Sequence, residues 1–269
     1  MNDAADTTDI LCEIQDGVAF VTFNRPEKLN ALTPGNFRDI KHLFRDLARD
    51  ENVRSVLLTG VGRAFCVGAD LSATENTDNQ SPGDFAGDAM HGYLTLAIRA
   101  IAECPKPVVV AVNGLAVGGG MSIALLGDIV IAAQSAKFTQ VFTPKLGIVP
   151  DAGSTWLLPR AIGSARAMGL MMLGEPLDAE RAESWGLIWK VVGDDALQAE
   201  AKAVALQLAQ GPTTGFGLLK KTLAVSAKHS FHEQLHVETE ANRQAFATED
   251  CTEATNAFLE KRPAKFIGR

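Results

Sequence analysis

The chain has 269 residues, 46% of them hydrophobic and 21% charged, with a formal net charge of -7. This length can build one large hydrophobic core with a small appended region. The acidic balance argues against a nucleic-acid partner, which usually needs a basic face, and no apolar run reaches the ~18 residues of a membrane span. The N-terminus lacks the apolar stretch of a signal peptide, and four scattered cysteines show no metal-ligand spacing, so we expect a cytoplasmic protein without bound metal.

The first half of the chain alternates apolar strand-like runs with helical patterns. Residues 17–23 are expected to form a strand that ends at Asn24-Arg25-Pro26. Thr33 followed by Pro34 is typical of a helix start, and apolar residues then recur on one face to about residue 48. Residues 53–59 are the next expected strand. A glycine-punctuated loop over 60–70 and a polar, mobile segment over 72–88 should follow.

A triple glycine marks the middle of the chain. After an expected helix over 88–102, the apolar run Val108–Val112 predicts a buried strand. Gly118-Gly119-Gly120 follows, and residues 121–126 have a helical pattern. Backbone N–H groups at a helix N-terminus have no intrahelical partner, and glycine lets a ligand approach them closely. The triple glycine is therefore a candidate anion or oxyanion site.

In the second half of the chain, helical patterns replace the alternation of strands and helices. One more strand is expected over 128–132, and beyond Asp194 the pattern is helical over 194–209, 212–228, 231–249 and 251–260. Strands alternating with helices predict α/β layering. We therefore expect an α/β core over residues 1–200 and a helical C-terminal region over 201–269.

Four stretches of the chain form a recognisable set of motifs. They are Asn24-Arg25-Pro26 with Asn30-Ala31-Leu32, Arg63-Ala64-Phe65-Cys66 with Gly68-Ala69-Asp70-Leu71, Ala111-Val112-Asn113-Gly114 with the triple glycine, and Ala257-Phe258-Leu259-Glu260-Lys261-Arg262. In this order they resemble the crotonase superfamily of enoyl-CoA hydratases and isomerases. The resemblance covers about residues 10–269. It implies a spiral of ββα turns with a helical C-terminal trimerisation region, assembled as a homotrimer or a dimer of trimers.

The chemistry that this resemblance implies is stabilisation of a thioester enolate. Two backbone N–H groups would bind the thioester oxygen, and in this chain they belong to Ala69 and Gly119. Preorganised donors of this kind typically contribute about 3–4 kcal/mol each. The alternative is that both loops are ordinary tight turns.

The resemblance also implies that coenzyme A arrives as part of the substrate and that no cofactor is bound permanently. The matching positions are Lys28, Leu29, Ala31, Arg63, Phe65, Ala69, Asp70, Leu71, Phe258 and Lys261, the last two reaching a neighbouring subunit's site in some members. Charge supports Arg63 and Lys261, because coenzyme A phosphates are anionic. The alternative is that Lys28, Arg63 and Lys261 are solvated surface cations.

Two departures from the family pattern bear on the reaction. Hydratases of this family carry two glutamates that activate water and deliver its proton. The first position is Ser122 here, and the second falls near Phe142 or Thr143. General acid–base catalysis needs a titratable group within hydrogen-bond reach, so hydration by paired carboxylates is disfavoured.

Asp151 is the carboxylate that remains in the right region. Its position resembles the catalytic aspartate of family members that move double bonds. Neighbouring Ile148, Val149 and Pro150 predict an apolar wall that would raise its pKa toward a value useful for proton transfer. The alternative is that Asp151 caps the helix beginning near Gly153. Residues 136–189 also resemble the 1,2-epoxyphenylacetyl-CoA isomerases of bacterial phenylacetate degradation, so an enoyl-CoA isomerase is expected.

Other functional classes remain open from the sequence. One is an enoyl-CoA hydratase, and another is a non-catalytic acyl-CoA-binding homologue, for which the direction of the Asp151 side chain is the discriminator. A hydrolase is a third, because residues 120–124 nearly match the Gly-x-Ser-x-Gly nucleophile elbow. The final glycine of that motif is missing, however, and no histidine is an evident base for Ser122. The acyl chain is not readable from the sequence.

Overall fold

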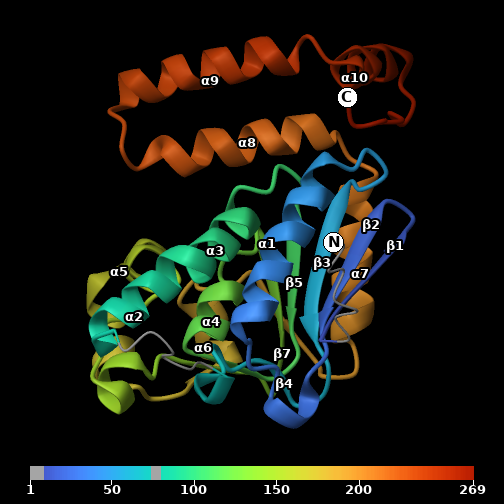
Figure 1. Cartoon of the computed structure of the whole chain (residues 1–269). Coiled ribbons are helices and arrows are strands. Elements are labelled where there is room, and N and C mark those ends of the chain that lie inside the picture. The colour runs from blue at the N-terminus through green and yellow to red at the C-terminus, as the bar shows by residue number, and fades with distance from the viewer. Residues whose placement is uncertain (1–8, 74–79) are drawn as a thin grey trace, which may run out of the picture.

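The computed structural model of the chain describes residues 9–73 and 80–269, and a six-stranded sheet runs through its core (Figure 1). In spatial order its strands are β1 (Ile10–Gln15), β2 (Val18–Phe23), β3 (Ser55–Gly60), β5 (Val108–Val112), β7 (Ile129–Ala133) and β10 (Lys190–Val192). β1 pairs antiparallel with β2, and the other neighbouring pairs are parallel. Every residue of β5 is fully buried, as its unbroken apolar sequence predicts.

A second, four-stranded sheet completes the core. Its strands in spatial order are β4 (Ala64–Cys66), β6 (Leu115–Val117), β8 (Lys137–Thr139) and β9 (Leu177–Asp178). β4, β6 and β8 are parallel, and β9 is antiparallel to β8. β3, β5 and β7 of the large sheet are each followed directly by a strand of the small sheet, so the chain winds as the expected spiral. Because the carboxyl ends of parallel neighbours meet at one edge, the segments after β4, β6 and β8 converge there.

Helices cover the sheets and join the turns of the spiral. Those of the core are η1 (Pro26–Lys28), α1 (Pro34–Arg49), η2 (Leu71–Ala73), α2 (Pro82–Ala89), η3 (Met90–Leu94), α3 (Thr95–Ala102), α4 (Gly119–Ala124), η4 (Phe142–Leu146), α5 (Ser154–Leu173), α6 (Ala179–Ser184) and α7 (Leu197–Ala209). η3 and η4 are π-helical turns. α1 packs against α3 and β1, whereas α7 packs against β2, β3, β5 and β7.

The start of α1 follows directly from its sequence. The Thr33 hydroxyl accepts a hydrogen bond from the Asn36 N–H (3.1 Å), and the Asn36 side chain accepts one from the Thr33 N–H (3.0 Å). This reciprocal capping satisfies two backbone donors, and Pro34 occupies the first helical position. The expected apolar face is confirmed, with Phe37, Ile40, Phe44 and Leu47 buried and Leu43 packed against the core.

Two segments that we expected to be loops contain regular structure. Ser81 caps α2 and Pro82 begins it, so residues 82–88 of the expected mobile segment are helical; residues 74–79 lie outside the described part of the chain. The glycine-punctuated loop contains β4. This strand is too short to show a periodic pattern, and its pairing with β6 in the next turn of the spiral decides its conformation.

The C-terminal helices are confirmed and form a layer at one end of the molecule (Figure 1). They are α8 (Thr213–Ser226), α9 (Phe231–Ala245) and α10 (Glu249–Glu260). Residue 200 lies within α7, which packs on the large sheet, so the separate layer begins with α8. The layer exposes large apolar side chains, namely Leu219, Leu223, Phe231, Leu235, Phe246, Phe258 and Leu259. None of the described helices is both long and apolar enough to cross a membrane.

Candidate active site

Three of the predicted site residues lie at one edge of the small sheet. Ala69 follows β4, Gly119 opens α4 directly after β6, and Asp151 lies between η4 and α5, in the segment that follows β8. Because β4, β6 and β8 are parallel neighbours, their carboxyl ends bring these segments together. The outer side of such an edge is the usual ligand site of open parallel sheets.

Glycine allows the loop after β4 to touch the first turn of α4. A β-carbon on Gly120 would lie 2.0 Å from the Cys66 carbonyl oxygen, so α4 packs directly on the backbone of β4. A β-carbon on Gly68 would lie 3.1 Å from the Gly119 nitrogen. Gly118 has a positive φ of 53° at the N-cap of α4, a conformation that glycine adopts readily. The loop that carries Ala69 therefore lies against the first peptide of α4.

The backbone N–H groups of Ala69 and Gly119 are free to bind a ligand. Leu32 pairs with Ala69 in a parallel bridge, in which its N–H donates to the Gly68 oxygen (2.8 Å) and its own oxygen accepts from the Asp70 N–H (2.9 Å). These two hydrogen bonds use the Gly68 carbonyl and the Asp70 N–H, which belong to the residues before and after Ala69. In a parallel bridge the N–H of the residue between them points away from the partner strand, so the Ala69 N–H faces away from Leu32. Gly119 is the first residue of its helix and has no intrahelical acceptor. Within residues 9–73 and 80–269, neither N–H donates to another protein group.

The Asp151 carboxylate lies beside Gly119. Its Oδ1 lies 3.9 Å from the position of a β-carbon on Gly119. Burial raises the pKa of Asp151 to about 6, and a hydrogen bond from its own backbone N–H opposes the rise. At the start of α5 the Ser154 N–H donates to the backbone carbonyl oxygen of Asp151 (3.0 Å), not to its side chain. Among the described residues, no other residue donates a hydrogen bond to this carboxylate.

The backbone after Asp151 is held in an unusual conformation. Ala152 has a φ of 49° and Gly153 a φ of 85°, so two successive residues lie in the left-handed region. For an alanine this conformation costs roughly 1–2 kcal/mol. Strained residues of this kind persist where the surrounding structure holds them and are common at active sites. Here the turn lies between Asp151 and Ser154, whose hydroxyl contacts Ser122 of α4.

The positions of the two hydratase glutamates carry no titratable group. Ser122 is fully buried, and its hydroxyl contacts Ser154 (2.5 Å) and the Gly118 oxygen (3.2 Å) rather than a histidine. Its side chain is therefore not the nucleophile of a hydrolase. The Phe142 ring lies 3.5 Å from the position of a β-carbon on Gly118, and the Thr143 hydroxyl donates to the Ile148 oxygen (3.0 Å).

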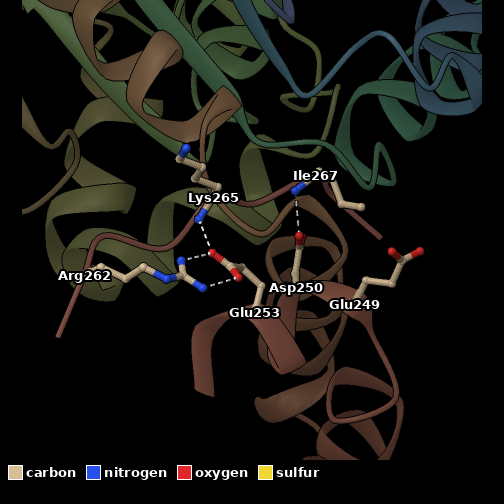
Figure 2. A pocket seen from close by; sticks show the side chains of 6 residues that line it. All are labelled: Glu249, Asp250, Glu253, Arg262, Lys265 and Ile267. Carbon is tan, nitrogen blue, oxygen red and sulfur yellow. Dashed lines mark hydrogen bonds and ion pairs between the residues drawn. The ribbon is translucent and has the colours of Figure 1, made fainter. Parts of the chain in front are cut away.

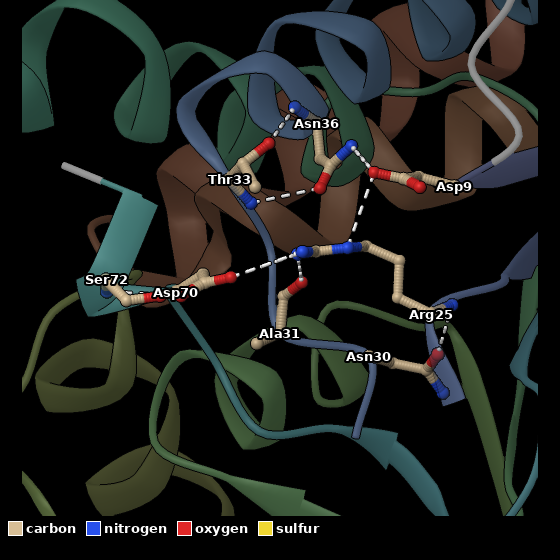
Figure 3. Close-up of polar contacts among 8 residues, drawn as sticks. All are labelled: Asp9, Arg25, Asn30, Ala31, Thr33, Asn36, Asp70 and Ser72. Atoms are coloured by element: carbon tan, nitrogen blue, oxygen red, sulfur yellow. Dashed lines mark hydrogen bonds and ion pairs between the residues drawn. The ribbon is translucent and has the colours of Figure 1, made fainter. Parts of the chain in front are cut away.

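Arg25 holds the loop after β4 in place, a role that the sequence did not reveal (Figure 3). One guanidinium nitrogen donates to the Ala31 oxygen (2.5 Å), and the group pairs with Asp70 (3.3 Å) and Asp9 (3.4 Å). The Ser72 hydroxyl, together with Arg25, lowers the pKa of Asp70. Because Asp70 directly follows Ala69, this cluster fixes the loop that presents the Ala69 N–H. Arg25 stands in a recognised motif, but only the folded chain shows its partners.

The residues predicted to bind coenzyme A divide into two groups. Lys28, Leu29 and Ala31 belong to the segment that ends at Leu32, so the bridge between Leu32 and Ala69 places them beside the candidate oxyanion loop. Lys28 and Arg63 are exposed, and within the described residues neither side chain has an acidic partner. Leu71 is 66% exposed at the start of η2.

The other residues predicted to contact coenzyme A are buried, already paired within the chain, or far from Ala69. Phe65 is fully buried and packs edge-on against Phe23 (ring centroids 5.5 Å apart), so the prediction for its side chain is wrong: it is a core residue. The Asp70 carboxylate is engaged by Arg25 and Ser72. Phe258 and Lys261 lie at α10, at the opposite end of the molecule from β4 (Figure 1), so they do not reach the site of their own chain.

A prominent cavity of about 400 Å³ lies elsewhere, beside α10 (Figure 2). Four of its charged side chains, those of Glu249, Asp250, Glu253 and Arg262, have partners within the chain. The Glu253 carboxylate accepts from Arg262 (2.6 and 2.9 Å) and from the Lys265 N–H, while Asp250 accepts from the Ile267 N–H (2.6 Å). These contacts lower the pKa of Glu253 to about 2. The cavity marks where the C-terminal tail is fastened to α10.

Comparison with known proteins agrees with the geometry. Residues 13–269 match the family model described as enoyl-CoA hydratase/isomerase. The chain is 44% identical over 260 residues to the 1,2-epoxyphenylacetyl-CoA isomerase of Escherichia coli, covering 97% of this chain and 98% of that one. It is 41% identical to a protein of Rhodobacter capsulatus named as a probable enoyl-CoA hydratase, covering 96% and 97%. The crystal structure of an enoyl-CoA hydratase from Bacillus anthracis superposes with a TM-score of 0.89 at 30% identity, covering 97% and 100%.

Proposed function

The chain belongs to the enoyl-CoA hydratase/isomerase family, and we propose that within this family it is an enoyl-CoA isomerase that uses Asp151 as its proton-transferring group. The observation that carries the proposal is the half-buried Asp151 carboxylate facing Gly119, in a site whose two glutamate positions hold Ser122 and either Phe142 or Thr143. One carboxylate can move a proton between two carbons, whereas the hydratases use a pair to handle water.

The N–H groups of Ala69 and Gly119 would bind the thioester oxygen. As a proton leaves the substrate, negative charge develops on this oxygen, and fixed backbone donors stabilise it without reorganisation. Each such donor typically contributes about 3–4 kcal/mol to transition-state stabilisation. The unpaired state of both groups in the described chain supports this role.

Asp151 would take a proton from an allylic carbon, or from a carbon activated by a ring or epoxide. With a 3-enoyl thioester, the C–H bond breaks, its electron pair enters the dienolate, and the carboxylate becomes a carboxylic acid. The same acid then returns the proton to another carbon, and the electrons of the oxyanion re-form the thioester carbonyl. A pKa of about 6 suits both directions, because the group gains and loses a proton near neutral pH.

Coenzyme A would enter and leave as part of the thioester, with no permanently bound cofactor. Lys28 and Arg63 are exposed cations suited to its phosphates, and Leu29 and Ala31 lie on the segment beside Ala69. The ring of the buried Phe65 has no part in this proposal.

A neighbouring copy of the chain would complete the coenzyme A site. Phe258 is 82% exposed, and both Phe258 and Lys261 lie far from the site of their own chain. The apolar side chains of α8–α10 suit an interface between copies, since large apolar patches on a surface commonly mark association sites. A homotrimer or a dimer of trimers would place these residues against a partner.

The test compares the wild type with Asp151→Asn on 3-enoyl-CoA, crotonyl-CoA and epoxyphenylacetyl-CoA. The amide keeps the shape but cannot act as a base, so we expect isomerisation to slow by roughly 100-fold or more. Asp39→Asn is the matched control, because burial also raises the pKa of this aspartate, which belongs to α1 and not to the segments after β4, β6 and β8. Full isomerase activity in Asp151→Asn would contradict the mechanism, and efficient hydration of crotonyl-CoA by the wild type would favour a hydratase.

A further inference from the structure

Three fully buried polar side chains lie beneath the candidate site. They are Ser122 of α4, Gln140 immediately after β8, and Ser154 at the first position of α5. Each is 0% exposed. Burying a polar group costs free energy unless hydrogen bonds compensate, so such a cluster is expected to have a purpose or a complete set of partners.

The three side chains form a continuous chain of hydrogen bonds. Gln140 Nε2 donates to the Ser154 oxygen (3.2 Å), the two serine oxygens are 2.5 Å apart, and the Ser122 oxygen is 3.2 Å from the Gly118 carbonyl oxygen. The ends fix its direction, because an amide nitrogen can only donate and a carbonyl oxygen can only accept. Ser154 therefore donates to Ser122, and Ser122 donates to Gly118.

The orientation of the Gln140 amide supports this direction. Its Oε1 is buried and has no hydrogen-bond partner within the described residues. With the amide reversed, the whole NH2 group would take that place, and two buried donors would lack acceptors instead of one oxygen. Because each unsatisfied buried group is costly, the arrangement in which Nε2 contacts Ser154 is the favoured one.

This series of hydrogen bonds ends at a peptide group of the candidate oxyanion site. The Gly118 carbonyl and the Gly119 N–H belong to one planar amide. The Gly118 oxygen accepts from both the Ser122 N–H (3.1 Å) and the Ser122 hydroxyl (3.2 Å). Hydrogen bonds accepted at the carbonyl fix the plane of the amide. They also polarise it, which makes its N–H a stronger donor.

We propose that Ser122 is a positioning residue that orients and polarises the Gly118–Gly119 peptide, with Ser154 and Gln140 behind it in the same chain. The inference rests on the proposed function in one respect, that the Gly119 N–H binds the thioester oxygen. Under this proposal Ser122, which stands at the first glutamate position of the hydratases, has a role other than acid–base catalysis. Ser122 does not touch the substrate; it acts through the backbone that does. The Ser122 hydroxyl oxygen also lies 3.5 Å from the backbone carbonyl oxygen of Asp151, so the same side chain links α4 to the backbone that carries the proposed base.

The test uses Ser122→Ala and Ser154→Ala, each of which removes a different hydrogen bond from the series that links Gln140 to the Gly118 carbonyl. Ser55→Ala is the matched control, because Ser55 is also fully buried and donates to a backbone oxygen, that of Ala205 (2.7 Å), away from the site. The direct readout is the stretching frequency of the thioester carbonyl of bound butyryl-CoA, labelled with ¹³C at that carbon. Steady-state kinetics with 3-enoyl-CoA and thermal unfolding complete the measurements.

We expect the wild type to lower the carbonyl frequency on binding, and both site variants to reduce this shift. The kcat should fall by roughly threefold to tenfold, less than the ~100-fold or more that follows removal of an oxyanion donor, with KM nearly unchanged. Ser55→Ala should lower the unfolding temperature but leave the carbonyl shift and kcat as in the wild type.

The outcomes separate this inference from the function on which it rests. If the wild type shifts the carbonyl frequency and Ser122→Ala shifts it equally, with unchanged kcat, the positioning role is overturned and the proposed function stands. An equal loss of shift in Ser55→Ala also overturns it, because general loosening would then explain the effect. If the wild type produces no shift at all, the proposed oxyanion role of Gly119 fails.

Discussion

Asp151 and Gly119 face each other across the candidate site, with the carboxylate Oδ1 3.9 Å from the point at which a side chain on Gly119 would begin. The two residues come from different turns of the spiral, one opening α4 and the other preceding α5. This arrangement puts a partly buried base beside the backbone donor proposed to hold the thioester oxygen. A substrate carbon close to that carbonyl would therefore lie within reach of the base.

A methyl group on Gly119 should remove activity and leave the fold intact. Its β-carbon would meet Gly68 Cα at 3.6 Å and Asp151 Oδ1 at 3.9 Å, which are ordinary contacts, but it would fill the space beside the base. By contrast, a β-carbon on Gly120 would lie 2.0 Å from the Cys66 oxygen. We expect Gly119→Ala to unfold like the wild type and Gly120→Ala to lose about 1–3 kcal/mol or more of stability. Chemical denaturation measures the free energy of unfolding of both variants, and steady-state kinetics measure their isomerase activity. Full activity in Gly119→Ala would contradict the proposed position of the active site.

The pH dependence of isomerisation should reveal Asp151. Burial raises its pKa to about 6, and the group acts as a base only when deprotonated. We expect kcat/KM to rise with pH up to about 6 and then level off, since this parameter reports groups of the free enzyme. The residual activity of Asp151→Asn should lack this rise, whereas Asp39→Asn should keep it. A flat wild-type profile between pH 5 and 7 would exclude Asp151 as the base.

Replacing Asp151 should also stabilise the protein at alkaline pH. Its folded-state pKa lies above the ordinary value of 3.8, so the folded state favours the protonated form. That contribution is present at low pH and is lost as the pH rises through about 6. Asn cannot ionise, so at pH 8 we expect Asp151→Asn to gain about 1–2 kcal/mol over the wild type, allowing for partial exposure, and less at pH 4. Urea unfolding of the wild type and Asp151→Asn at pH 4 and pH 8 measures this difference in stability. Equal stabilities of the two proteins at pH 8 would mean that the carboxylate is solvated.

The pair between Arg25 and Asp70 should be strongly coupled. Their side chains are 15% and 10% exposed, and Arg25 also donates to the Ala31 oxygen. A double-mutant cycle with Arg25→Ala and Asp70→Asn should give a coupling of about 1–3 kcal/mol in unfolding free energy. Arg25→Ala should also lower kcat/KM by roughly tenfold, because the loop that carries Ala69 loses its anchor.

The pair between Arg99 and Glu103 provides the comparison for this cycle. It is an exposed pair one helical turn apart, with both side chains 63% exposed. Its coupling should stay below about 0.5 kcal/mol. Similar couplings for the two pairs would show that Arg25 is an ordinary surface cation.

The apolar surface of α8–α10 should mediate association between copies. Leu223 on α8 is 67% exposed, and a glutamate there would place charge in the proposed interface. We expect the wild type to sediment as a trimer or hexamer, Leu223→Glu to shift toward the monomer, and its KM for acyl-CoA to rise as Phe258 and Lys261 of a neighbour are lost. Leu11→Glu on β1, where Leu11 is 46% exposed, is the control. A monomeric wild type in sedimentation would exclude this arrangement.

The sequence alone predicted the features that depend on local pattern. The buried run at β5, the capped start of α1 and the four C-terminal helices follow from periodicity and capping residues near each other in the chain. The same is true of the missing carboxylate at Ser122, because residue identity at a recognised motif needs no coordinates. Family membership was likewise available from motifs in their order.

Tertiary structure decided the contacts between residues distant in the chain. The pairing of β4 with β6 brings Ala69 toward Gly119. Ser154, just after the left-handed turn at Ala152, contacts Ser122 of α4, and Arg25 pairs with Asp70, which lies 45 residues further along the chain. Burial also settled questions that local patterns left open. A phenylalanine in a motif can face a ligand or the core, and Phe65 faces the core. Such outcomes depend on strand pairing and packing between turns of the spiral, which local hydrophobic patterns do not encode.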